Sequence, residues 1–167
     1  MPAGTFDVMD FISKAGVGVI TGVIAAIVTA NVALRRFYHE KWWEKKSQSY
    51  NELVGNLFEL QIFFRGVRRR YRKERMGRIF TDDEAIDWDK SEALYIAIQR
   101  QLALAPISLS SKTDSLVKQF FEQSQSKTWE MHNEGMPEEV IYEEKIKLLQ
   151  RVINEIAHDA KEELKFR

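Results

Sequence analysis

Apolar residues dominate the first part of the chain and follow helical periods in the rest. Residues 15–34 read AGVGVITGVIAAIVTANVAL and contain no charged side chain. As a helix they would be about 30 Å long, which matches the hydrocarbon core of a bilayer. Asp7 and Asp10 precede the stretch, whereas a secretory signal has a basic start. The pattern therefore predicts one transmembrane helix at 15–34, preceded by a short N-terminal segment at 1–14.

Basic and aromatic residues follow this apolar stretch and predict its orientation. Residues 35–49 are rich in lysine, arginine and aromatic rings, while Lys14 stands almost alone on the other side. The positive-inside rule then places the N-terminus outside and the C-terminal domain in the cytoplasm of a bacterium, at the inner membrane. The residues expected at the interface with the lipid bilayer are Arg35, Arg36, Trp42 and Trp43.

Small residues recur every four positions within the apolar stretch. They are Gly18, Gly22, Ala26 and Ala30. Residues at this spacing share one face of a helix, and small side chains let a second helix approach closely. The pattern predicts self-association, so we expect a homo-oligomer.

Beyond the basic-aromatic segment, apolar residues are spaced alternately three and four apart. This spacing predicts one long helix at about 47–76, with Phe58, Ile62 and Phe63 widening its apolar stripe. The residues of the stripe are Tyr50, Leu53, Leu57, Leu60, Phe64, Val67 and Tyr71. A wide stripe is typical of a helix inside a bundle rather than of a two-stranded coiled coil.

Three further helical patterns complete the chain, and no segment alternates as a strand would. Helices are expected at about 91–104, at about 112–132, and from Pro137 to about residue 164. Three prolines and eight glycines are few, which favours long helices. The sequence thus predicts an all-α fold, in which one N-terminal transmembrane helix precedes a four-helix, mostly antiparallel cytoplasmic bundle in residues 50–167.

Composition excludes several kinds of chemistry. The chain has no cysteine, which excludes disulfides, thiolate metal sites and cysteine nucleophiles. It has no glycine-rich phosphate loop and no histidine cluster with metal-ligand spacing, so we expect neither a metal site nor a cofactor. The 25 basic and 25 acidic residues cancel, but they are segregated along the chain.

One basic tract is the most prominent charged feature. Its cations are Arg65, Arg68, Arg69, Arg70, Arg72, Lys73, Arg75 and Arg78. One interpretation is a phosphate-binding surface for RNA, DNA or a nucleotide. The other is pairing with an acidic surface, either of a partner protein or of this chain. The acidic candidates within the chain are Asp82, Asp83, Glu84, Asp87, Asp89, Glu138, Glu139, Glu143 and Glu144.

Arg151 and His158 are the candidate catalytic residues. Their spacing, in RVINEIAH, resembles the R-x(4–6)-H signature of HEPN domains, although Val152 stands where that signature has a polar residue. The resemblance implies an RNA-cleaving cleft between two subunits, in which His158 would handle a proton and Arg151 would stabilise phosphate charge. The alternatives are a contact between subunits and a solvated polar face.

The segment FYHEKWWEKKSQSYNEL resembles a set of small bacterial inner-membrane proteins that share an EKWWEKK…Y passage. The whole plan also resembles the membrane accessory proteins of type VI-B CRISPR systems, which implies a setting in antiphage defence. The leading hypothesis is a membrane-anchored, self-associating helical effector or scaffold without enzymatic activity. The alternatives are a membrane-tethered HEPN-type ribonuclease and a membrane-tethered nucleic-acid or nucleotide sensor.

Overall fold

The computed structural model describes residues 8–78 and 85–165, and it describes side chains from residue 25 onward. Every regular element in these residues is helical, which confirms the expected all-α class for this part of the chain. The helices are α1 (Val8–Arg75), α2 (Trp88–Ala103), α3 (Ala105–Ser108), α4 (Ser111–Asn133) and α5 (Glu138–Glu163). The chain divides into two compact units, Met1–Trp43 and Glu44–Arg167, and α1 contributes residues to both.

The first unit corrects the prediction of a transmembrane helix. No helix in the described residues is long and apolar enough to cross a membrane. Of the predicted stretch, residues 25–34 have described side chains, and charge begins at Arg35. The side chains of residues 1–24 lie outside the described part. The predicted transmembrane helix at 15–34 is therefore wrong on this finding, although α1 is helical there.

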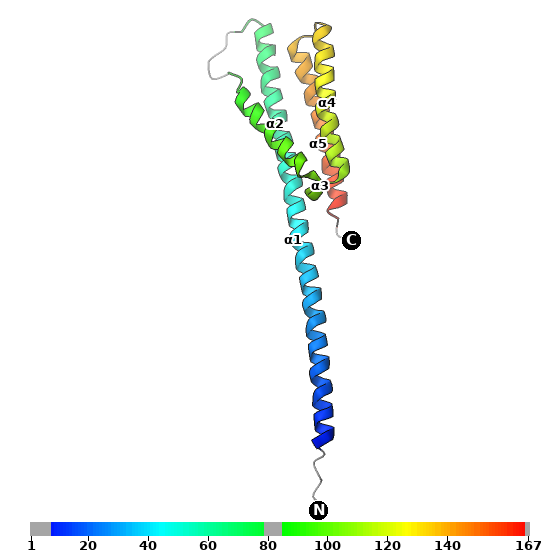
Figure 1. Cartoon of the computed structure of the whole chain (residues 1–167). Helices are drawn as coiled ribbons and strands as arrows, with labels where there is room; N and C mark the ends of the chain where they lie inside the picture. Colours follow the sequence, from blue (N-terminus) through cyan, green and yellow to red (C-terminus); the bar gives the residue numbers. More distant parts are fainter. Residues whose placement is uncertain (1–7, 79–84, 166–167) are drawn as a thin grey trace, which may run out of the picture. The chain divides into compact units, whose positions relative to one another are not determined.

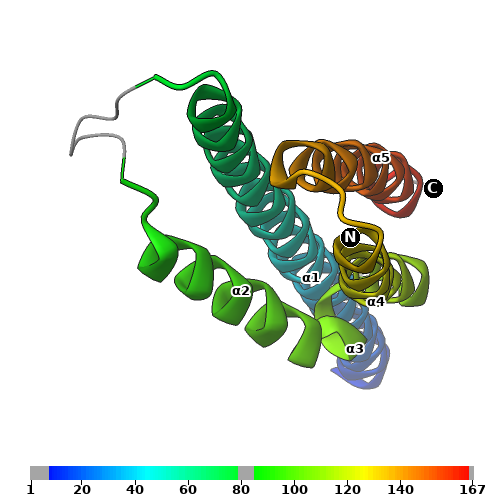
Figure 2. The same cartoon turned by 90° about the horizontal axis from the view of Figure 1, so that it is seen from above.

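The second unit is a helical bundle, as the sequence predicts. In Figure 1, α1 and α4 run in one direction while α2 and α5 run in the other. Seen from above in Figure 2, α1 lies between α2 on one side and α5 on the other, and α4 lies beside α5. The short α3 connects the end of α2 to the start of α4.

Local signals explain where the helices begin. The Asp87 carboxylate accepts the backbone N–H of Lys90 at 3.0 Å and caps α2. The Ser110 hydroxyl accepts the backbone N–H of Thr113 at 3.0 Å and caps α4. Gly135, with φ of +67°, turns the chain after α4, and Pro137 precedes the first turn of α5.

The core lies where the apolar stripe of α1 meets the other helices. The predicted stripe is confirmed from Tyr50 to Val67, while Tyr71 is half-buried. Phe63 is buried as well, but Phe58 and Ile62 are 49% and 42% exposed, so the stripe is narrower than expected. The other helices contribute Ile98, Val117, Phe120, Tyr142, Ile146, Leu149, Val152, Ile153 and Ile156. Packing in this core determines which faces of the helices remain exposed.

Candidate functional site

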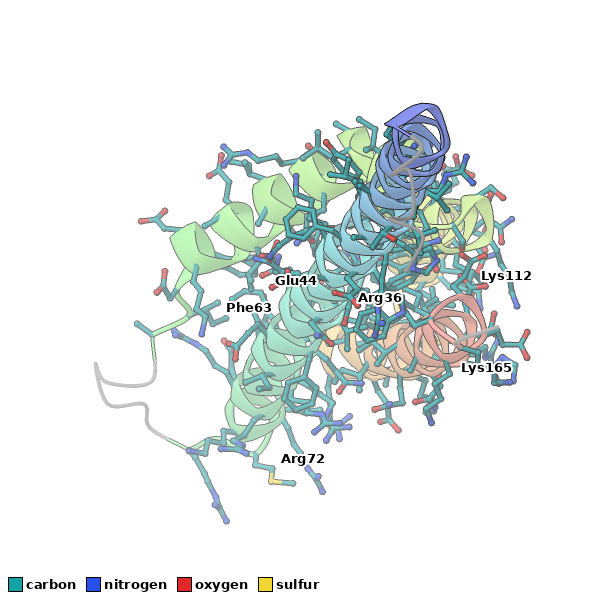
Figure 3. All side chains as sticks on the ribbon, turned by 90° about the horizontal axis from the view of Figure 1, so that it is seen from below. Arg36, Glu44, Phe63, Arg72, Lys112 and Lys165 are labelled. Atoms are coloured by element: carbon teal, nitrogen blue, oxygen red, sulfur yellow. The ribbon has the colours of Figure 1, made fainter. Side chains whose placement is uncertain are left out.

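The basic tract divides into parts with different surroundings. Arg72 and Arg75 project from α1 to the Glu139 carboxylate of α5, with N–O distances of 3.7 and 2.9 Å. The Glu139 side chain is only 13% exposed. Figure 3 labels Arg72 among the side chains of α1. For these two arginines the structure favours the interpretation that the tract pairs with an acidic residue of its own chain.

Three other cations of the tract differ from Arg72 and Arg75 in their partners and in their exposure to solvent. Arg65 donates to the side-chain oxygen of the buried Gln61 at 3.1 Å. Arg68 is half-buried, and Arg78 is exposed. Among the other acidic candidates, Asp87 caps α2, whereas 82–84 lie outside the described residues. The tract is therefore partly neutralised by internal contacts rather than wholly available to a ligand.

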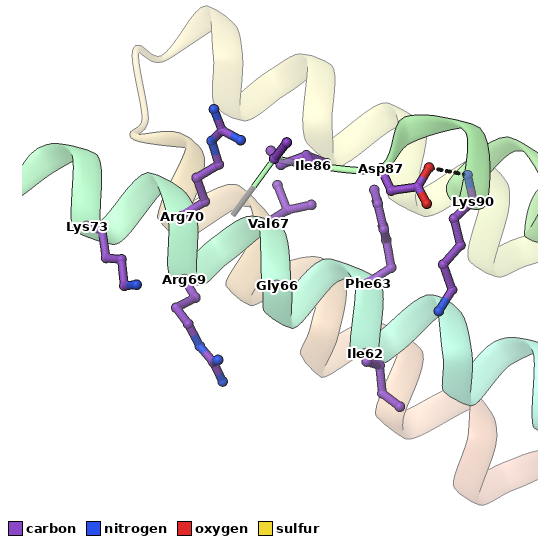
Figure 4. Close-up of a pocket in the computed structure, with 11 residues that line it drawn as sticks. Ile62, Phe63, Gly66, Val67, Arg69, Arg70, Lys73, Ile86, Asp87 and Lys90 are labelled. Carbon is purple, nitrogen blue, oxygen red and sulfur yellow. Dashed lines mark hydrogen bonds between the residues drawn. The ribbon is translucent and has the colours of Figure 1, made fainter. Parts of the chain in front are cut away.

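A small open hollow of about 270 Å³ lies between α1 and the start of α2 (Figure 4). Apolar side chains line its inner part, and basic side chains line its rim. The lining residues include Phe63, Val67, Ile86, Arg69, Arg70, Lys73, Asp87 and Lys90. Lys90 also pairs with Glu59 at 3.1 Å, and both Arg70 and Lys73 take part in further interactions. We call this feature the basic hollow. Its chemistry fits an anion that carries an apolar group.

Arg151 and His158 both lie exposed on α5. Neither makes a hydrogen bond or ion pair with another described residue, and neither lines the basic hollow. The intervening Asn154 accepts a hydrogen bond from Gln150 at 3.2 Å. Within one copy of the chain, the structure thus places the two residues on an open polar surface. Their catalytic role remains a prediction.

The residues expected at the membrane interface lie in the first unit. Arg36 pairs with Glu40 one helical turn later at 3.0 Å, and Arg35 is exposed. Trp42 is 51% exposed, whereas Trp43 is half-buried, and both make further interactions. Ala26 and Ala30 are exposed, while Gly18 and Gly22 lie outside the residues with described side chains.

The structure also contains a buried polar cluster that the sequence did not indicate. Asp159 of α5 is 7% exposed, and its carboxylate accepts hydrogen bonds from the hydroxyls of Ser110, Thr113 and Tyr50. Burial alone would raise the pKa of Asp159, but these hydrogen bonds and the positive charge of Lys112 outweigh it and lower the pKa. Figure 3 labels Lys112, at the start of α4. The cluster joins three helices and has a structural role.

A metal centre finds no support in the described residues, because no group of three or more histidine, aspartate or glutamate side chains there could hold an ion. No family model matches the chain, and no curated protein or solved structure matches it significantly.

Proposed function

We propose that this chain is a self-associating helical scaffold or effector, without enzymatic activity, that acts at the cytoplasmic surface of the bacterial inner membrane. The observation that carries the proposal is the exposure of residues 25–34, which contain no charge and have every side chain open to solvent. A contiguous apolar surface of this kind marks a site of contact with a protein or a membrane.

Large side chains make exposure of this segment costly in water. Ile27, Val28, Val32 and Leu34 are 56%, 56%, 62% and 52% exposed. Each Å² of apolar surface removed from water contributes about 25 cal/mol, so these side chains favour an apolar environment. The lipid interface offers such an environment to the apolar face of a helix that lies on a membrane.

The residues that follow favour lipid over a protein partner. Arg35 and Lys41 are exposed cations, and each would contribute about 1 kcal/mol near an anionic membrane surface. Phe37, Tyr38 and Trp42 are 54%, 67% and 51% exposed. Aromatic rings beside basic residues are typical of the headgroup region. The resemblance of this segment to small bacterial inner-membrane proteins supports the same location. The proposed antiphage setting rests on the separate resemblance of the whole plan to the membrane accessory proteins of type VI-B CRISPR systems.

Vesicle flotation tests the membrane contact. The full chain is mixed with vesicles of phosphatidylcholine alone or with phosphatidylglycerol, and the bound fraction is measured. We expect binding to the anionic vesicles, and a loss of at least tenfold in Ile27→Asp/Val32→Asp because a charge in this segment opposes transfer into lipid. Ile107→Asp, at a residue of α3 that is 77% exposed, is the matched control and should bind like wild type. Equal binding of all three proteins would refute the proposal.

Self-association is proposed through the exposed face that carries Ala26 and Ala30. Small side chains at this spacing let two helices approach closely. Leucine at both positions should shift the protein toward monomer in mild detergent, as measured by light scattering. Val28→Leu, which leaves the small residues in place, should not. An unchanged oligomer in the double variant would exclude this face from assembly.

The basic hollow supports a second candidate function, binding of a phosphate-bearing nucleotide or RNA. Arg69 is exposed and lines the hollow, so a phosphate group bound there should contact its side chain. Arg69→Gln should weaken binding of a fluorescent RNA oligonucleotide, whereas Arg100→Gln, at an exposed residue of α2, should not. Equal affinities in the two variants would exclude the hollow as a specific phosphate site.

A further inference from the structure

Aromatic side chains from four helices surround a second depression, which shares Phe63 with the basic hollow. Two adjoining hollows of about 430 and 520 Å³ share Tyr95 and Lys145. Their volumes lie in the range of about 300–1,000 Å³ that is usual for ligand pockets. The rings that line them are Phe63, Phe64, Trp88, Tyr95, Phe121, Trp129 and Tyr142. We call the combined feature the aromatic groove.

Two of the helices that line the groove, α2 and α4, run in opposite directions (Figure 1). Tyr95 of α2 and Phe121 of α4 approach to 5.5 Å between ring centres. Trp88 and Trp129 remain 51% and 69% exposed. Because indole rings have large apolar faces, their exposure leaves unused surface on which a flat molecule can stack.

Lys145 of α5 supplies the positive charge of the groove. Its ammonium nitrogen lies 5.0 Å from the centre of the Tyr142 ring and 5.9 Å from that of Phe64. Among the described residues no carboxylate forms an ion pair with it. Burial lowers the pKa of Lys145, and the negative charge of Glu138 partly opposes this effect. A half-buried ammonium held only by ring faces is placed to accept an anion.

The other polar groups of the groove limit the ligand further. His132 already lies 3.3 Å from the Glu138 carboxylate, which leaves Lys145 as the main positive charge. Gln99, Gln125 and Thr128 offer hydrogen-bonding groups that carry no charge. The exposed carboxylate of Glu92 also lines the groove. A lining with one half-buried cation and one exposed carboxylate matches a ligand with one negative charge rather than a polyphosphate.

We propose that the aromatic groove binds a planar aromatic compound that carries a single negative charge. The rings stack on Trp88, Tyr95 or Trp129, and the anionic group pairs with Lys145. Stacking on an aromatic side chain removes the faces of both rings from water and so favours binding. This site uses residues other than those of the proposed membrane contact, so either proposal can fail without the other.

Two matched fluorescent probes test the proposal. One is 8-anilinonaphthalene-1-sulfonate, whose flat naphthalene ring carries one negatively charged sulfonate, and the other is N-phenyl-1-naphthylamine, which has the same rings without the sulfonate. Lys145→Met removes the charge and keeps an apolar side chain. We expect it to weaken sulfonate binding about tenfold, because an interaction with a charged group contributes about 1.5–3 kcal/mol. Binding of the neutral probe should stay within about twofold of wild type.

Control variants show whether the loss of sulfonate binding comes from Lys145 itself. Lys147→Met removes an exposed lysine from the same helix and should change neither affinity, while Lys145→Arg should retain sulfonate binding. Trp129→Ala, at a mostly exposed ring, should weaken both probes without lowering the melting temperature. Probe bound at the exposed residues 25–34 would not respond to substitutions at position 145, which separates the two sites.

Three outcomes would overturn the proposal. The first is sulfonate binding that Lys145→Met leaves unchanged, and the second is an equal loss of both probes in that variant. The third is a wild-type chain that binds neither probe and is dimeric, but becomes monomeric in Trp129→Ala, because the groove would then be occupied by a second copy. A selective loss of sulfonate binding in Lys145→Met, with Lys147→Met unchanged, would support the proposal.

Discussion

The Thr113 hydroxyl donates a hydrogen bond of 2.6 Å to the Asp159 carboxylate, and both side chains are buried. Thr113 lies in the first turn of α4 and Asp159 near the end of α5. A carboxylate beside a helix N-terminus interacts favourably with the helix dipole and with its free N–H groups. The pair therefore anchors the start of one helix to the end of another.

Acid should weaken this anchor. In the folded chain the pKa of Asp159 is below its ordinary value of 3.8. Folding therefore stabilises the ionised carboxylate relative to the protonated form. The resulting stability is fully present above about pH 4 and is lost as pH falls through the folded pKa. We expect the free energy of unfolding in urea to drop over this window, and Asp159→Asn to flatten the drop. The exposed Asp89→Asn should leave the pH profile unchanged.

Asp159→Asn should also destabilise the chain at neutral pH. The amide cannot accept all of the hydrogen bonds from Tyr50, Ser110 and Thr113, and an unpaired buried polar group costs roughly 1–3 kcal/mol. Urea denaturation at pH 7 measures this change directly. A free energy of unfolding equal to that of wild type would show that the cluster is dispensable.

Removing Glu139 should release two arginines of the basic tract. Glu139→Gln leaves Arg72 and Arg75 without their carboxylate partner, so binding to inorganic polyphosphate should strengthen and become more salt-dependent. Glu155→Gln makes the same change in net charge at an exposed residue of α5 and is the control. If both variants bind polyphosphate equally, net charge rather than the released arginines explains the binding.

Arg151→Ala and His158→Ala separate the catalytic interpretation from the others. Both residues are exposed and make no described contact, so each substitution should change the free energy of unfolding by less than about 0.5 kcal/mol. We expect no multiple-turnover cleavage of single-stranded RNA by the wild type. Cleavage by wild type that His158→Ala abolishes, with the oligomer intact, would reinstate the ribonuclease alternative.

Residues that repeat along one helix could be predicted, whereas residues that meet across helices could not. The spacing from Tyr50 to Val67 identifies the buried stripe because one helix face repeats every three or four residues. The sequence predicts that Phe58 and Ile62 widen the stripe. Their side chains instead lie on the exposed side of α1.

The buried Asp159 and the aromatic groove required the tertiary structure. Asp159 stands among surface charges in the sequence, and its partners Tyr50, Ser110 and Thr113 lie far away along the chain. Each ring of the aromatic groove resembles an ordinary core residue of its own helix. Only the arrangement of α2 and α4 shows that several of these rings remain open to solvent.

The central claim is that the first unit contacts lipid, and tryptophan quenching by brominated lipids tests it most directly. Trp88→Phe and Trp129→Phe leave Trp42 and Trp43 as the reporters in an otherwise full chain. Vesicles that contain phosphatidylglycerol and brominated phosphatidylcholine should quench their fluorescence, and adding Ile27→Asp/Val32→Asp should restore it. Fluorescence that is the same with brominated and unbrominated vesicles, while the protein remains folded, would contradict the proposed membrane contact.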